Sequence, residues 1–119
     1  MQKENILYSK SYAFAIRTVN LSRYLNNEKR EFILSKQILR SGTAICALIS
    51  EAEFAQSQAD FINKLMVSLK EANETKYWIN LLYDTNCISN AMYKSLIDDI
   101  REIIRLLVSI VKKIKSKTS

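Results

Sequence analysis

Residues 39–54, LRSGTAICALISEAEF, hold the only glycine of a 119-residue chain that contains no proline. Small side chains surround this glycine, Gly42, and apolar residues recur around it at helical spacing. A glycine in a helix interior costs about 1 kcal/mol relative to alanine, so a packing constraint is a reasonable cause of its presence. If the next turn centres near Gln56, Gly42 lies level with Glu71 of the following helix. The stretch therefore predicts a seam at which these two helices approach closely.

Apolar residues recur at helical spacing along the whole chain, and polar breaks divide it into four segments. The composition supplies few of the residues that form tight turns or end strands. Short links between long helices make neighbouring helices antiparallel. The sequence therefore predicts an all-α fold, an antiparallel up-down-up-down four-helix bundle in a single domain over residues 1–119. The predicted helices span residues 6–26, 28–55, 58–85 and 90–115.

Polar residues at the segment boundaries are expected to cap three of these helices. Asn26 precedes an acidic first turn, which favours an asparagine cap for the second helix. Ser57 is followed three residues later by Asp60, as in a capping box, and this predicts the start of the third helix. Ser89 or Asn90 is expected to cap the fourth.

The chain contains no histidine, which excludes Ser-His-Asp and Cys-His nucleophile systems, His-ligated zinc and the Glu-x-x-His motif of di-iron bundles. Cys46 and Cys87 fall in neighbouring helices at positions roughly 30 Å apart, beyond the reach of a disulfide. The most apolar stretch, residues 103–111, is interrupted by Arg105 and is far too short to span a bilayer. We also find no signal segment. We expect a cytoplasmic, non-enzymatic protein with no cofactor, no metal and no membrane association.

The net charge of +6 is concentrated in the first and last segments. Within the last segment, four cations fall on one side of the predicted helix, beside its apolar face, with Asp98 interrupting the row. These are Lys94, Arg101, Arg105 and Lys112. Cations at this spacing can follow a phosphate backbone, which predicts a nucleic-acid-binding surface. A solvated helix flank explains the row equally well.

The first and fourth helices carry more apolar residues than one packing stripe requires. Either the core is wide and some aromatic residues lie on the surface, or the excess forms an interface between subunits. We favour a homo-oligomer. The predicted interface residues are Tyr8, Tyr12, Ile16, Val19, Ile103 and Ile110.

Glu71 and Glu74 lie three residues apart and so share one face of the third helix. Paired carboxylates can act as acid and base in glycoside chemistry, but no nucleophile motif or phosphate-binding loop accompanies them. We expect them instead to pair with Arg40 in a structural polar network that Glu51 joins. A metal site built from these three glutamates and Glu53 lacks any ligand-spacing signature.

Residues 37–82 contain the motifs LRSGTAI, ISEA, SQADF and LKEANETKYW. In this run the chain resembles the four-helix-bundle proteins encoded by intervening sequences in 23S rRNA genes. That family is similar in turn to the accessory variability protein of diversity-generating retroelements. The resemblance implies a homopentameric barrel of bundles with a basic nucleic-acid-binding surface, and the retroelement relatives also partner a reverse transcriptase.

Charge and resemblance together predict a non-enzymatic, oligomeric bundle that binds RNA or another nucleic acid through its basic surface. The alternative is a protein-interaction scaffold or accessory subunit, for example of a reverse transcriptase, whose basic surface only keeps it soluble. The biological process is not specified by any motif.

Overall fold

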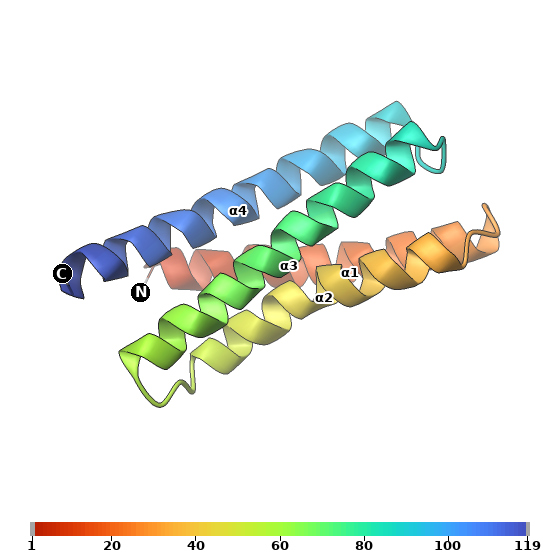
Figure 1. Cartoon of the computed structure of the whole chain (residues 1–119). Coiled ribbons are helices and arrows are strands. Elements are labelled where there is room, and N and C mark those ends of the chain that lie inside the picture. The colour runs from red at the N-terminus through yellow and green to blue at the C-terminus, as the bar shows by residue number, and fades with distance from the viewer. Residues whose placement is uncertain (1, 119) are drawn as a thin grey trace.

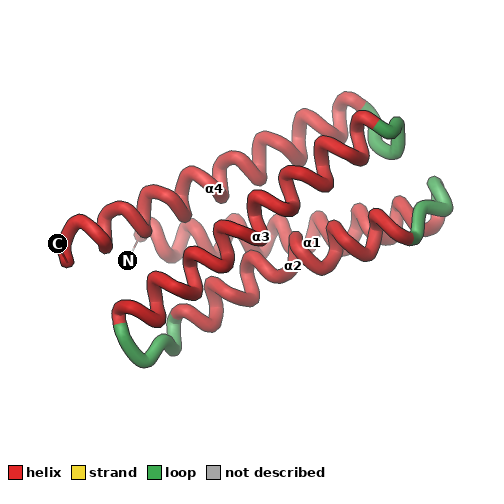
Figure 2. Tube along the Cα trace, viewed as in Figure 1, coloured by secondary structure: helices red, strands yellow, loops and turns green. Residues whose placement is uncertain are grey.

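The computed structural model describes residues 2–118, and side chains from 5 to 117. Within that range the chain forms four helices and no strand, which confirms the predicted fold class. The helices are α1 (Gln2–Asn27), α2 (Ile33–Ala52), α3 (Gln58–Asp84) and α4 (Asn90–Thr118). They form a rod of 48 × 22 × 20 Å, and their short connections alternate between its two ends (Figures 1 and 2).

Each helix packs against two others, so the four form a closed ring in the order α1, α2, α3, α4. The α2–α3 contact is the most extensive, and the α1–α4 contact is the least. Leucine and isoleucine side chains fill the space between the four helices, together with Phe14 of α1. Each helix must therefore present an apolar arc wide enough for two neighbours.

The predicted start of the second helix, at residue 28 with Asn26 as its cap, is wrong. Asn26 lies in the last turn of α1, where its side-chain oxygen accepts the Ser35 hydroxyl at 2.6 Å. Arg30 follows with a left-handed φ of 53°, and the Glu31 amide donates back to the Leu25 carbonyl at 2.9 Å. A left-handed residue after a helix is usually glycine, and the bond across Arg30 spans six residues, one more than in the usual helix-ending pattern. Because an arginine occupies the left-handed position, the sequence shows no sign of the turn that delays the start of α2 to Ile33.

The acidic side chain of Glu31 supplies the cap that was assigned to Asn26. One carboxylate oxygen accepts the backbone amides of Ile33 and Leu34, both at 2.9 Å. A carboxylate at this place satisfies free amides of the first turn and suits the positive end of the helix dipole. For this reason α2 begins at Ile33.

The predicted starts of the third and fourth helices are confirmed. The Ser57 hydroxyl accepts the Asp60 amide at 3.0 Å, and the Asp60 carboxylate accepts the Gln56 amide at 3.2 Å. This reciprocal pair resembles a capping box. The Ser89 hydroxyl accepts the Met92 amide at 3.1 Å, so Ser89 is the cap of α4.

Gly42 faces α1, and not the α3 seam that the sequence predicts. A Cβ atom at Gly42 would lie 2.6 Å from both Oγ1 and Cγ2 of Thr18, closer than a Cβ contact allows. The neighbouring Ser41 faces α3, where its hydroxyl lies 2.8 Å from that of Thr75. Successive residues of a helix point about 100° apart, so these two residues pack against different helices.

The α2–α3 seam is nevertheless close-packed, as expected. The Ser68 hydroxyl of α3 donates to the Ile45 carbonyl of α2 at 2.9 Å. Ser41, Ser68, Ala72 and Thr75 are completely buried. Small side chains that bond to each other or to backbone let the two helix backbones approach.

Cys46 is buried, Cys87 is partly buried, and both are free thiols. Between residues 2 and 118, no helix combines the length and apolar character needed to cross a membrane.

Candidate nucleic-acid interface

One flank of α4 carries an exposed row of positive charge. Lys94, Arg101, Arg105 and Lys112 are all exposed, and none has an ion-pair or hydrogen-bond partner among the described residues. Their spacing of seven, four and seven residues keeps them on one side of the helix, over about 27 Å of its length. We call these four residues the basic flank. Asp98 lies within it and is exposed.

The other flank of α4 faces α1 and carries acids that are already neutralised. Lys10 pairs with Glu102 at 3.1 Å, and Arg17 pairs with Asp99 at 2.6 Å. Arg17 also donates to the Ser95 carbonyl at 3.4 Å. Lys10 and Arg17 of α1 are thus engaged with α4, whereas the cations of the basic flank are left for solvent or a ligand. Sequence reasoning missed these pairs, because their register depends on how α1 and α4 meet in space.

A surface hollow adjoins the basic flank. It has a volume of about 430 Å³, and Ile104, Val108 and Ser109 line it together with Arg105 and Lys112. Ile104 and Val108 are half-buried and lie one turn apart, so their side chains are neighbours on the helix surface. Cations and apolar surface therefore lie side by side on α4.

Of the residues predicted to form a subunit interface, some are exposed and others are buried in the bundle core. Tyr8, Tyr12 and Ile16 of α1 are exposed, and the two tyrosine rings stack with centroids 6.0 Å apart. Val19 is half-buried. Ile6, which the sequence reasoning left out, is 45% exposed. We call Ile6, Tyr8, Tyr12 and Ile16 the α1 patch.

Assigning Ile103 and Ile110 to a subunit interface is a mistake. They are 1% and 3% exposed and belong to the core of the bundle itself. The wide apolar arc of α4 is used to contact both α1 and α3, so it provides no evidence for a second subunit.

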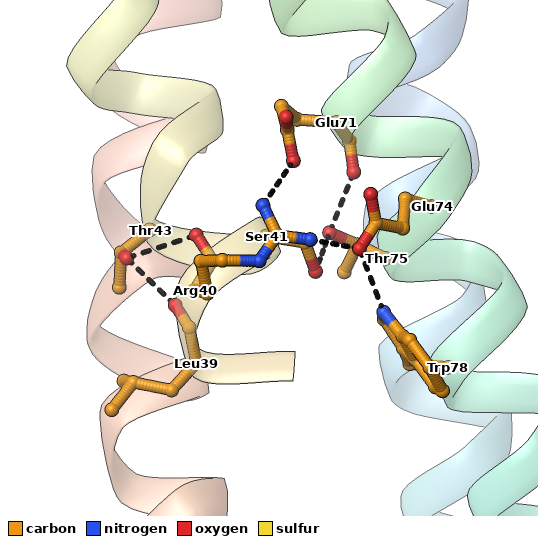
Figure 3. Close-up of polar contacts among 8 residues, drawn as sticks. All are labelled: Leu39, Arg40, Ser41, Thr43, Glu71, Glu74, Thr75 and Trp78. Carbon is orange, nitrogen blue, oxygen red and sulfur yellow. Dashed lines mark hydrogen bonds and ion pairs between the residues drawn. The ribbon is translucent and has the colours of Figure 1, made fainter. Parts of the chain in front are cut away.

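Arg40, Glu71 and Glu74 come together across the α2–α3 seam (Figure 3). The Arg40 guanidinium donates to Glu71 Oε1 at 3.1 Å and, through Nη2, to Glu74 Oε2. The Trp78 indole also donates to Glu74 Oε2, at 3.1 Å, and closes a network that the sequence reasoning described without it. A tryptophan four residues after a glutamate lies on the same helix face, which was a usable signal.

Glu51 does not join this network. It pairs instead with Lys64, at 3.1 Å, near the α2–α3 turn. Eleven residues of α2 separate Glu51 from Arg40, which is about 16 Å along the axis. Among the described side chains, no three acids, cysteines or histidines gather in a group that could hold a metal ion, so the four glutamates considered above do not form a metal site.

The charges of the network favour its ionised form. The Trp78 indole, and after it the Arg40 guanidinium, lower the pKa of Glu74 below its ordinary value. The hydrogen bond to Glu74 is the main cause that raises the pKa of Arg40. A carboxylate held ionised in this way is poorly suited to act as a general acid near neutral pH. The network is best explained as a structural contact that holds α2 against α3.

The fold and its surfaces define a class: a small four-helix bundle that carries a basic flank on α4 and an exposed apolar patch on α1. A family model described as 23S rRNA-intervening sequence protein matches residues 3–109, and the chain belongs to this family. The resemblance predicted from the sequence motifs is confirmed at the level of the family.

A solved structure of the same fold supports this assignment. The chain is 57% identical to a protein with unknown function from the S23 ribosomal protein family of Bacteroides thetaiotaomicron VPI-5482. The match covers 92% of this chain and 98% of the other, with a TM-score of 0.91. No curated protein matches the chain. The relative has the fold but no assigned function, so a function must be argued from the surfaces.

Proposed function

We propose that the protein is a non-enzymatic, oligomeric bundle that binds RNA or another nucleic acid through the basic flank of α4. The observation that carries this proposal is the row of four exposed cations without acidic partners among the described residues. Arg101 and Arg105 lie one turn apart, about 6 Å along the axis. Lysine and arginine at such intervals can neutralise successive phosphates and release their counterions.

The α1 patch supports the oligomeric part of the proposal. Tyr12 and Ile16 are more than half exposed, and aromatic side chains are enriched at protein interfaces. The resemblance noted in the sequence implies a pentamer. Copies related by rotation would place several basic flanks on one particle, and binding by several flanks at once would strengthen a weak contact. Light scattering measures this part independently, and a monomeric mass would contradict it.

Titration of a labelled structured RNA at several salt concentrations tests the nucleic-acid part. With four phosphate contacts on single-stranded segments, log K should fall against log salt with a slope of about −3. Removing the four charges should abolish measurable binding at moderate salt. The test variant combines Lys94→Gln, Arg101→Gln, Arg105→Gln and Lys112→Gln.

A matched control removes the same amount of charge from other exposed positions. It combines Arg23→Gln, Lys29→Gln, Lys36→Gln and Lys70→Gln. If binding depends on the basic flank, this control retains most of the wild-type affinity. Equal losses in both variants would mean that only net charge matters, and no binding by wild type at low salt would contradict the proposal.

The α1 patch also favours a second candidate, a protein-interaction scaffold or accessory subunit that uses this surface for a partner such as a reverse transcriptase. On this alternative Tyr12→Ser and Ile16→Ser abolish partner binding, while the flank variant leaves it intact. The two candidates are therefore separated by which surface, α1 or α4, is needed for binding.

A further inference from the structure

We propose that the basic flank takes single-stranded rather than double-stranded nucleic acid, with an unpaired base seated in the hollow over Ile104 and Val108. This inference rests on the proposed function and deepens it. It comes from the arrangement of two kinds of side chain on the same exposed side of α4, which lies across the ring from α2 (Figure 1).

The two kinds of side chain form parallel rows along the helix. Arg101, Arg105 and Lys112 make a row of charge, and Ile104 and Val108 make a short apolar row beside it. Arg105 and Lys112 stand about 10 Å apart along the axis, at either end of the hollow. A ligand lying along α4 would therefore meet cations on one side and apolar surface on the other.

A single strand has the complementary arrangement, because it presents one row of phosphates and one row of unpaired bases. Proteins that bind single strands combine a cationic track with aromatic side chains on which bases stack. Here the aliphatic side chains of Ile104 and Val108 would take the place of the aromatic ones. In a duplex the bases are paired and stacked inside, and the outward surface is phosphate and sugar. A duplex could reach the cations of α4, but it would leave the apolar row without a partner.

The size and polarity of the hollow agree with this ligand. About 430 Å³ leaves ample room for one base, and none of the described side chains that line the hollow is acidic. Its polar lining consists of two cations and one serine, so a negatively charged backbone beside it meets no repulsion from the lining itself. The apolar floor contributes by removing one base face from water.

The test compares a labelled oligouridine of about 20 nucleotides with the same strand paired to oligoadenine, by fluorescence anisotropy at low salt. We expect the wild-type protein to bind the single strand at least about fivefold more tightly than the duplex. Val108→Asn, which makes the floor polar without changing charge, should weaken single-strand binding about fivefold and leave duplex binding unchanged.

Val67→Asn is the matched control, because Val67 is also a half-buried valine but lies on α3 and does not line the hollow. It should leave both affinities unchanged, and thermal melting of both variants checks that the fold is intact. Should Val108→Asn unfold the chain, Val108→Thr gives a smaller change with the same predicted direction.

The outcomes separate this inference from the function on which it rests. No binding of either nucleic acid would contradict the proposed function. Equal or tighter binding of the duplex, or equal effects of Val108→Asn on both ligands, would overturn only the single-strand inference. A labelled peptide of alternating Glu and Leu is the third ligand. If it binds more tightly than oligouridine and Val108→Asn weakens it more, the hollow is a peptide site and the inference is wrong.

Discussion

Between α2 and α3, contact is made by small and hydroxylated side chains that are completely buried, such as Ser68 and Thr75. Between α1 and α4, two ion pairs reach across the surface, and the Lys10 and Glu102 side chains are each 43% exposed. Both seams also bury apolar side chains, and the ion pairs of Arg40 cross the first seam as well, so the contrast concerns the main polar contacts of each. Salt barely affects the buried hydrogen bonds of the first seam, whereas water and salt screen the exposed ion pairs of the second. The buried polar contacts between α2 and α3 therefore fix the relative position of these helices, and the ion pairs between α1 and α4 add little stability.

The difference also explains the charge distribution of α4. Its acids Asp99 and Glu102 are used against α1, so the opposite flank is left basic. The α1–α4 ion pairs therefore contribute to the candidate function even though they contribute little to the stability of the fold. Substitutions at the buried polar contacts of α2 should be costly, and substitutions in the α1–α4 ion pairs should not.

Gly42→Ala is expected to have the largest effect, a loss of about 2 kcal/mol in the free energy of unfolding. The new Cβ would lie 2.6 Å from the buried Thr18 side chain, which is short and already bonded to the Phe14 carbonyl at 2.8 Å. Alanine is about 1 kcal/mol more favourable than glycine in a helix interior, so the steric clash itself costs more than the net loss. Urea unfolding measures the change.

Thr18→Ala supplies the control, because it removes the two closest of the three Thr18 atoms that the new Cβ would meet. In the Gly42→Ala, Thr18→Ala double variant we expect much of the lost stability to return. Additive losses would show that the α1–α2 contact at Gly42 is not the cause.

Thr75→Val should cost about 1.5 kcal/mol, because it leaves the buried Ser41 hydroxyl without its partner across the seam. Adding Ser41→Ala should recover part of this loss by removing the unsatisfied group. The loss should be the same in about 0.05 M and about 0.5 M salt, although the Debye length shortens several-fold between these concentrations. A loss that shrinks in high salt would contradict the assignment of this seam to buried hydrogen bonds.

Glu74→Gln should cost at most about 1 kcal/mol at pH 7, since the network is partly exposed and solvent screens it. The folded-state pKa of Glu74 is lowered, so the contribution of the carboxylate is complete above its ordinary pKa of about 4.3. The contribution disappears as the pH falls through the lower folded-state value. The stabilities of wild type and variant should therefore converge below about pH 4, and a difference that persists in acid would contradict this account.

Asp99→Asn should have the smallest effect, at most about 0.5 kcal/mol, because the pair with Arg17 is exposed to solvent. High salt should remove even this difference. An effect as large as that of Thr75→Val would show that the α1–α4 ion pairs are a principal source of stability, and the contrast between the polar contacts of the two seams would then be lost.

Sequence reasoning succeeded where local chemistry determines the result. Helical periodicity identified the fold, and Ser57 and Ser89 marked two helix starts, because a cap depends only on residues a few positions away. The start of α2 was missed because Arg30 adopts a conformation usually left to glycine. The Arg40 pairing could be predicted, since an antiparallel register brings it level with Asn73, which lies between Glu71 and Glu74 in the sequence.

What the sequence could not supply was the rotation of each helix about its own axis. One residue separates Ser41, which faces α3, from Gly42, which faces α1, and periodicity alone does not resolve that difference. Ile103 and Ile110 were assigned to a subunit interface for the same reason. The width of an apolar arc on a helix does not reveal how much of that arc is covered by the two neighbouring helices of the bundle.

Trp78 is the only tryptophan of the chain, its indole is bonded to Glu74, and its ring meets that of Tyr77 at a centroid distance of 4.9 Å. The intrinsic emission of the protein is therefore a local optical probe of the α2–α3 seam, whereas circular dichroism averages over all four helices. If α1 separates first on heating, the far-ultraviolet signal will begin to fall while the emission is still native. Coincident curves would identify the bundle as one cooperative unit.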